Sequence, residues 1–419
     1  MSRFLFTILP SDDFGLLTRS LPIARELKLR GHEVAFCHPA RGPRILIREA
    51  GFENILPGQR VSRLPRFAAM WGVFQTLVRS STSEIWNVDH FSAAVRSGLG
   101  PTGVKAFVQT IRSYKADAVV DFWNFAGCIA ARITATPLIT VISSFQHPES
   151  PGFIWWKDPP AKIPTAVPWL NGILGQYGLP AIKNAGDLFI GDRTLVLGIP
   201  ELDPLPETAK ATYIGAVLWE NPEARLPDWF AALRRDKPVV WIYPGKLRYW
   251  GKLRTWGDSE IVLQSSIQAL AKEDVQVVVG IGHQDIPRSM LPLPASFVLE
   301  PFLPGLTMAG RSDLMIHHGG YGSCQTGLYA GVPQVIIPTF SERESNARRV
   351  LQQGAGEIVL PTSSASGKEK KVDSEELAAK VRKVLSTPSY KGNALRISAK
   401  LKEYGGPSKA AQLIEEVIK

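Results

Sequence analysis

The segment 317–328, with the sequence HHGGYGSCQTGL, combines residue types that can bind a phosphate group. An apolar strand ends there, glycines permit a tight turn, and a helix begins with Ser323 near its N-terminus. Backbone N–H groups and the positive end of that helix would then point at one spot, which suits an anion. His318 and the Ser323 hydroxyl add side-chain donors. The segment therefore predicts a phosphate site.

Short β-branched segments alternate with amphipathic helical segments along most of the chain. We expect strands at 4–9, 32–37, 118–121 and 138–142, and again at 239–243, 275–279, 313–316 and 334–337. This alternation predicts parallel sheets covered by helices. Because ligands of open α/β sheets bind at the carboxyl ends of the strands, the segment 317–328 lies where a ligand is expected.

A proline-rich stretch separates two such α/β halves. We expect the following division: an N-terminal Rossmann-like domain at 1–205, a linker at 206–236, a C-terminal Rossmann-like domain at 237–395, and a C-terminal helix at 396–419 that packs back on the N-terminal domain. The expected fold class is α/β, with the two Rossmann-like domains facing each other across a cleft.

Composition excludes several classes of protein. The 419 residues are 45% hydrophobic and 21% charged, which is typical of a globular chain and not of a disordered one. There is no apolar run long enough for a transmembrane helix, and the cysteines form no CxxC pair, so we expect a cytoplasmic protein without a disulfide framework or metal site. The net charge of +10 suits acidic small molecules, but basic residues are spread along the chain, so nucleic acid is not expected.

The glycine-rich segment and its surroundings resemble the donor signature of the family 1 glycosyltransferases, which include bacterial antibiotic and plant natural-product enzymes. The matching residues are His317–Ser323, Ala330–Pro333, Pro338 and Asn346–Ala347, with shorter matches at Gly31–Val34, Tyr213–Gly215, Gly354–Gly356 and Gly405–Ala411. The resemblance implies the two-domain GT-B architecture. It also implies a nucleoside-diphosphate sugar, with UDP or dTDP, as co-substrate, and neither a cofactor nor a metal.

The resemblance implies roles for residues of the C-terminal half. It places these residues at the donor diphosphate: His318, Gly320, Tyr321, Gly322, Ser323 and Gly245. Phe302 stands where an aromatic side chain stacks on the nucleotide base, beside Leu303; the alternative for Phe302 is an aromatic side chain of the core.

Two positions depart from the family pattern. Gly305 replaces a glutamine that usually contacts the base or ribose. Glu342 and Arg343 replace an Asp/Glu-Gln pair that holds the sugar hydroxyls. Glu342 can still accept hydrogen bonds, whereas Arg343 is a fixed cation that forks well onto oxyanions. Arg343 is therefore expected to read a different sugar, to touch the diphosphate, or to turn away into a surface ion pair.

The reaction of this family needs a base that accepts the proton of the acceptor hydroxyl. Many members use a histidine in the first strand-to-helix loop, but the loop 10–16 here contains none. Its two acids, Asp13 as first choice and Asp12 as second, are the candidates, as in members that use an aspartate. The alternative is that one of them caps the helix. Asp121 resembles the family's second acidic residue, which orients the catalytic histidine.

Aromatic residues of the N-terminal half are candidates for the acceptor site. Trp123, Trp155 and Trp156 could form a wall for a flat hydrophobic acceptor, and His90 could line the same pocket. The alternatives are packing beneath a long loop or anchoring at a membrane surface for the Trp155–Trp156 pair, and a surface position for His90.

These observations predict an inverting, metal-independent glycosyltransferase. It would move a sugar to a hydroxyl of a hydrophobic small molecule, such as a natural product, a phenol or a lipid. The alternatives are a nucleotide-sugar epimerase or lipid-linked-sugar glycosyltransferase of the same fold, and a nucleotide-sugar binder that lacks catalytic activity.

Overall fold

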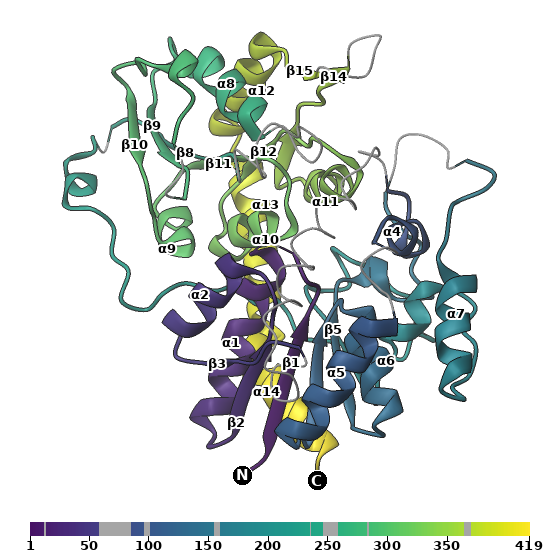
Figure 1. Ribbon diagram of the computed structural model, residues 1–419. Coiled ribbons are helices and arrows are strands. Elements are labelled where there is room, and N and C mark those ends of the chain that lie inside the picture. Colours follow the sequence, from purple (N-terminus) through teal and green to yellow (C-terminus); the bar gives the residue numbers. More distant parts are fainter. Residues whose placement is uncertain are drawn as a thin grey trace.

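The computed structural model describes residues 1–11, 14–57, 85–95, 101–154, 160–234, 236–245, 259–282, 285–363 and 370–419. The predicted α/β fold class is confirmed, because two parallel sheets, each with its own helices, lie one above the other (Figure 1). The predicted acids Asp12 and Asp13 and the tryptophans Trp155 and Trp156 lie outside the described residues.

The first sheet has the strand order β3-β2-β1-β4-β5-β6-β7, with all neighbouring strands parallel. Its strands are β1 (Arg3–Ile8), β2 (Glu33–Cys37), β3 (Glu53–Asn54), β4 (Ala118–Phe122), β5 (Leu138–Ile142), β6 (Arg193–Val196) and β7 (Thr212–Tyr213). The central strands are almost continuously apolar because helices cover both faces of the sheet. The short strand β7 falls within the segment 206–236 that was expected to be a linker.

Helices pack on both faces of the first sheet. They are α1 (Gly15–Leu29), α2 (Arg41–Glu49), α4 (Val88–Val95), α5 (Pro101–Tyr114), α6 (Phe125–Ile133), α7 (Val167–Gln176), and the 3₁₀ turns η2 (Ser144–Gln146) and η3 (Ala185–Phe189). Side chains of β1 alternate between two cores: Leu5 packs with α5 and α6, whereas Phe4 and Phe6 pack with α1. This alternation fixes the register of the sheet, and so the position of the loops at its carboxyl edge.

The second sheet has the order β10-β9-β8-β11-β12-β13, again fully parallel. Its strands are β8 (Val239–Tyr243), β9 (Gln276–Gly280), β10 (Phe297–Glu300), β11 (Leu314–His317), β12 (Gln334–Ile336) and β13 (Gly356–Ile358). The helices of this half are α8 (Ser259–Leu270), α9 (Gly305–Ala309), α10 (Tyr321–Ala330), α11 (Ser341–Gln352) and α12 (Ser374–Ser386), with the 3₁₀ turns η4 (Asp228–Ala232) and η5 (Arg288–Met290). A separate antiparallel pair is formed by β14 (Thr362–Ser363) and β15 (Lys370–Lys371). The order of the second sheet is the Rossmann strand order. Strands β9 and β10 are added on one side of β8, and β11 to β13 on the other, so the order of addition reverses between β8 and β11. The loops that follow those two strands are therefore the expected place for a ligand.

The C-terminal segment differs in detail from the single helix expected at 396–419. It forms α13 (Pro388–Glu403) and α14 (Gly406–Val417), because Gly405 and Gly406 both have positive φ and end the first helix. Helix α14 leaves the second half of the molecule and packs against α1 of the first half (Figure 1). Glu415 of α14 accepts hydrogen bonds there from Arg30 at 3.1 Å and contacts His32 at 2.9 Å.

Candidate functional site

A cleft of about 910 Å³ lies between the two halves and is lined by both. The first half contributes Pro10 and Ser11 after β1 and Trp123 after β4. The second half contributes Gly245 after β8 and the turn after β11. Each sheet thus presents to the cleft the loops at the point where its strand order reverses, between β1 and β4 in the first sheet and between β8 and β11 in the second. The sequence patterns predicted a ligand site at such a point.

His317 shapes the turn that enters the cleft. Its ring is fully buried, with Nδ1 accepting from the Gly319 N–H at 3.0 Å and Nε2 lying 2.6 Å from Oε1 of Gln334. Burial lowers the pKa of His317 to about 4, so the ring is neutral and donates through Nε2. The sequence analysis gave His317 no separate role. Its inward-facing position at the end of an apolar strand, next to two glycines, is the signal that could have shown one.

His318 lies between two glycine backbones. A Cβ added to Gly245 would lie 2.7 Å from Cε1 of His318, and a Cβ added to Gly320 would lie 2.5 Å from its Nε2. Neither glycine can therefore be replaced by a larger residue without displacing the ring. The His318 side chain is 9% exposed and lines the cleft. Burial, then the nearby charge of Arg343, keeps the pKa of His318 well below 6.5. His318 is therefore a neutral donor held in one orientation.

The first turn of α10 also faces the cleft. Gly320 is its N-cap and makes no side-chain cap, so the first backbone N–H groups of the helix have no partner from that residue. Tyr321, Gly322 and Ser323 all line the cleft beside His318. The helix dipole and these N–H groups favour a negatively charged group at this point.

The acid–arginine pair, in which Arg343 departs from the family pattern, lies on α11. Glu342 and Arg343 both line the cleft. Arg343 is only 6% exposed, so the predicted alternative of a surface ion pair is wrong. Its guanidinium donates to Thr339 Oγ1 at 2.6 Å and lies 4.7 Å from the centroid of the Phe340 ring, which keeps the cation at the wall of the cleft.

Asn346 orients Glu342 within this part of the cleft. Its Nδ2 donates to Oε1 of Glu342 at 2.6 Å and to the carbonyl oxygen of Gly319 at 3.0 Å. One amide therefore ties the acid on α11 to the glycine turn after β11. A carboxylate accepts several hydrogen bonds, so Glu342 has the chemistry to bind a ligand hydroxyl.

Phe302 and Leu303 form another part of the wall. Phe302 is 46% exposed and lines the cleft, so the alternative of a core position is wrong. Leu303 is buried against Trp241 of β8 and also reaches the cleft. An exposed aromatic ring at the mouth of a cleft is suited to stack on a flat ring of a ligand.

Aromatic side chains of the first half line the opposite side. Trp123 has φ of +61°, an uncommon value for a residue other than glycine, and its ring stacks on Phe91 with centroids 4.0 Å apart. Phe145 contacts the edge of the same indole at 5.5 Å, and Phe153 follows Phe145 at 4.8 Å. All four side chains line the cleft, whereas His90, on α4, is not among its lining residues.

Asp121 lies away from the cleft, contrary to its expected place beside the catalytic base. Its carboxylate is fully buried at the end of β4, where it accepts hydrogen bonds from Thr7 Oγ1 and from the Asn124 N–H at 2.9 Å. Burial raises its pKa to about 7. Asp121 thus fastens the β4–α6 turn to β1. The residues that flank the two candidate acids, namely Pro10, Ser11, Phe14 and Gly15, do line the cleft.

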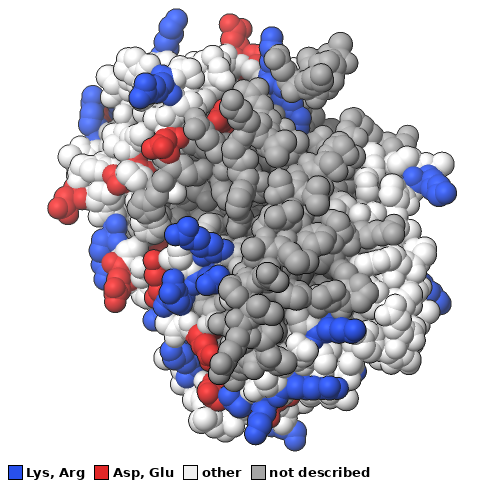
Figure 2. All heavy atoms as spheres, in the orientation of Figure 1, with Lys and Arg blue, Asp and Glu red and all other residues white. Residues whose placement is uncertain are grey.

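The charged side chains on the visible surface do not indicate a particular partner. Figure 2 shows basic and acidic side chains intermingled on both halves of the visible face. Within the described residues, no helix is long and apolar enough to cross a membrane.

Comparisons with known proteins place this architecture. Residues 264–417 match the family model for the C-terminal domain of erythromycin biosynthesis protein CIII-like proteins. The PGL/p-HBAD biosynthesis rhamnosyltransferase of Mycobacterium bovis is 26% identical over 318 residues, which cover 70% of this chain and 66% of that protein. The 4'-demethylrebeccamycin synthase of Lentzea aerocolonigenes is 30% identical over 252 residues, 58% of this chain and 55% of the synthase. The two alignments thus span 66% and 55% of the relatives' lengths, in both cases less than two thirds.

Solved structures extend the similarity over the whole chain. The spinosyn rhamnosyltransferase SpnG superposes with a TM-score of 0.71 at 18% identity, covering 99% of this chain and 100% of that one. The glycosyltransferase VinC, solved with dTDP, gives 0.70 at 18% identity and covers 99% of both chains. These comparisons agree with the resemblance to the family 1 glycosyltransferases that the sequence motifs indicate. The predicted GT-B fold is confirmed, and the donor signature of this family coincides with the His318 turn.

A first prediction concerns the diphosphate site. We expect His318→Ala to weaken UDP and dTDP binding and to lower turnover by roughly 10²-fold, comparable to the loss of one preorganised donor. Isothermal titration calorimetry measures the binding. His32→Ala, which removes a histidine that contacts α14 far from the cleft, is the control and should bind both nucleotides like the parent. Unchanged affinity in His318→Ala would contradict the assignment.

The low pKa of His318 makes a second prediction. Because the pKa of His318 lies well below 6.5, its ring stays neutral as the pH rises through the usual titration range of histidine, so its contribution to nucleotide binding should not change there. The ratio of the UDP dissociation constants of His318→Ala and the parent should therefore stay constant, within about twofold, from pH 6 to pH 8. Taking the ratio cancels the ionisation of the nucleotide itself. A ratio that rises steeply as the pH falls through about 6.5 would show a protonated His318 in the complex.

Proposed function

We propose that the protein transfers a sugar from a nucleoside-diphosphate sugar to a hydroxyl group of a hydrophobic small molecule. The observation that carries this proposal is that one cleft joins an anion-binding helix N-terminus on one side to an aromatic wall on the other. We further propose that 1–205 holds the acceptor and 237–395 the donor, with 206–236 as linker and 396–419 returning to the first domain.

The donor diphosphate would lie at the first turn of α10, with His318 and Ser323 as side-chain donors. Negative charge grows on this leaving group as the glycosidic bond breaks, so donors fixed in advance stabilise the transition state more than the ground state. The helix dipole supplies positive charge where other enzymes use a cation, which supports a metal-independent reaction. Phe302 would stack on the base, and Glu342 would accept from sugar hydroxyls.

The acceptor would lie against Trp123, Phe91 and Phe145. Attack from this side would reach the anomeric carbon on the face opposite the diphosphate, which would favour a single displacement with inversion. We propose Asp13 as the base and Asp12 as the second choice, because the residues on both sides of this pair line the acceptor side of the cleft. A carboxylate there can take the hydroxyl proton if its surroundings raise its pKa.

The proposal is tested by offering a panel of nucleotide sugars with mixed phenolic, alcoholic and lipid acceptors and detecting products by mass spectrometry. A rhamnosyl donor belongs in the panel, because similar proteins are named rhamnosyltransferases. A product heavier than the acceptor by one sugar supports the proposal. Conversion of the donor without any acceptor would indicate an epimerase instead, and binding of donors without turnover would indicate a binding protein.

Arg343 is expected to tune the choice of sugar. Arg343→Gln restores the usual acid–glutamine pair and removes a buried cation from the sugar side of the cleft, so the ranking of donors in the panel should change. Arg348→Gln is the matched control, because Arg348 is on the same helix but pairs with Glu344 at 2.8 Å and does not line the cleft. If both variants keep the parent's ranking, Arg343 does not contact the sugar.

The proposed base makes a sharper kinetic prediction. Asp13→Asn keeps shape and polarity but cannot accept a proton, so kcat with an aliphatic alcohol should fall by about 10²–10⁴-fold. An acidic phenol, already ionised near neutral pH, should lose less, and donor affinity should change little. Asp12→Asn should have the milder effect. If Asp12→Asn is inactive while Asp13→Asn is fully active, Asp12 is the base. If both variants are fully active, the base is a different residue.

A further inference from the structure

Helix α11 has a second set of polar side chains, which adjoins the side that carries Glu342 and faces the first half of the molecule. Ser341, Ser345 and Arg349 recur at intervals of four residues and so share one face of the helix. Ser341 Oγ accepts from the Ile85 N–H at 2.8 Å, and Ser345 Oγ accepts from the Ile154 N–H at 3.0 Å. All three side chains are buried. The helix that carries Glu342 and Arg343 is therefore fastened to backbone of the acceptor half.

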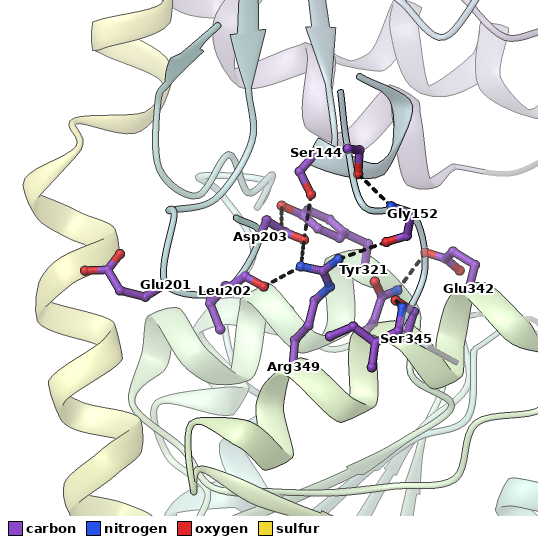
Figure 3. Close-up of polar contacts among 12 residues, drawn as sticks. Ser144, Gly152, Glu201, Leu202, Asp203, Tyr321, Glu342, Ser345 and Arg349 are labelled. Atoms are coloured by element: carbon purple, nitrogen blue, oxygen red, sulfur yellow. Dashed lines mark hydrogen bonds and ion pairs between the residues drawn. The ribbon is translucent and has the colours of Figure 1, made fainter. Parts of the chain in front are cut away.

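Asp203 joins this face to α10 (Figure 3). One carboxylate oxygen accepts from Ser144 Oγ at 3.1 Å and pairs with Arg349 at 2.9 Å, and the other accepts from the Tyr321 hydroxyl at 3.2 Å. Arg349 also donates to the carbonyl oxygen of Leu202 at 2.6 Å. Ser144 follows β5 of the first sheet, whereas Tyr321 and Arg349 belong to the second half. A single buried carboxylate thus connects both halves.

Tyr321 carries this connection directly to the anion site. It is the first residue of α10, so its backbone belongs to the helix N-terminus while its hydroxyl reaches Asp203. Gly198 packs against that hydroxyl: an added Cβ at Gly198, whose φ is +86°, would lie 2.9 Å from the oxygen. The Tyr321 hydroxyl is therefore confined between Gly198 and Asp203, both in the segment after β6, and its position constrains that of the helix N-terminus.

We call Ser341, Ser345, Arg349, Asp203 and Tyr321 the polar seam. Burying such charges costs desolvation energy, and an apolar contact of the same size would often be as stable. Hydrogen bonds and a buried ion pair differ from apolar contacts in being directional, so they are satisfied at one relative placement of the two halves only. In a two-domain enzyme whose donor and acceptor bind to different domains, that placement sets the distance between the reacting atoms.

We propose that Asp203 is a positioning residue: acting through Tyr321 and Arg349, it holds α10 and α11 at the distance from the acceptor half at which transfer occurs. This inference rests on the proposed function. It assigns the hydrogen-bonding side chains of the polar seam no contact with donor or acceptor, although the backbone of Tyr321 lies at the anion site. Loss of these side-chain contacts should therefore affect turnover more than the binding of either substrate.

Tyr321→Phe tests the proposal most cleanly, because it removes one hydroxyl and leaves no charge unpaired. We expect kcat for transfer to fall roughly tenfold, as for a small misplacement of reacting groups. The UDP dissociation constant should change less than about threefold, because the backbone N–H groups of α10 remain. Tyr329→Phe, at the other end of the same helix and outside the polar seam, is the control and should keep the parent's kcat. Asp203→Asn should act in the same direction and more strongly; if it fails to fold, Tyr321→Phe decides alone.

Two kinetic results would overturn the inference. Parent-like kcat in Tyr321→Phe, with only a lower melting temperature, would make the polar seam purely structural. An equal loss in UDP affinity and in turnover would make Tyr321 a donor contact.

A distance measurement separates this inference from the proposed function. Spin labels on Gln109→Cys in α5 and Ala379→Cys in α12, both exposed positions on opposite halves, report the spread of interdomain distances without any substrate. Adding Tyr321→Phe should broaden this distribution, and adding Tyr329→Phe should not. If the parent transfers no sugar but the distribution broadens, the proposed function fails and the polar seam stands. An unchanged distribution overturns the polar seam whatever the activity.

Discussion

The approach of two glycine backbones to the ring of His318 is the contact on which the donor side of the cleft depends. Gly245 follows β8 and Gly320 precedes α10, and neither leaves room for a Cβ beside the imidazole. The contact requires β8 and β11 to be neighbours, which the strand order provides. It also fixes where α10 begins. A neutral donor, a helix N-terminus and a glycine turn therefore meet at one point, because the sheet brings these loops together.

Helix α11 relates this point to the other half of the molecule. One side of the helix carries Glu342 and Arg343 to the cleft, and the adjoining side contacts the acceptor half through Ser345 and Arg349. A rigid helix with two such sides cannot move on one side without moving on the other. The choice of sugar and the relative placement of the two halves are thus linked by the same element, although the residues that serve them differ.

Sequence patterns predicted the fold class and the donor turn, because both depend on local features. Parallel strands buried on both faces are continuously apolar, and an anion-binding turn needs glycine and a helix start at fixed spacing. Helix α5 was not predicted from the sequence. Its buried residues Val104, Phe107, Val108 and Ile111 have the spacing of an amphipathic helix, which could have revealed it. The break between α13 and α14 was signalled by Gly405–Gly406, which were interpreted only as a family match.

What could not be predicted depends on contacts between distant segments. Asp121 follows a strand, as a catalytic acid would, and only the fold shows that Thr7 and Asn124 occupy its carboxylate. The polar seam depends on contacts between distant segments: Tyr321 meets Asp203, 118 positions away, and Ser341 meets Ile85, 256 positions away, and none of these residues has a local signature. The most direct test of the central claim is a crystal structure with UDP or dTDP bound. We expect the β-phosphate within hydrogen-bond distance of His318 and of the first N–H groups of α10; phosphates bound elsewhere in the cleft would contradict this assignment.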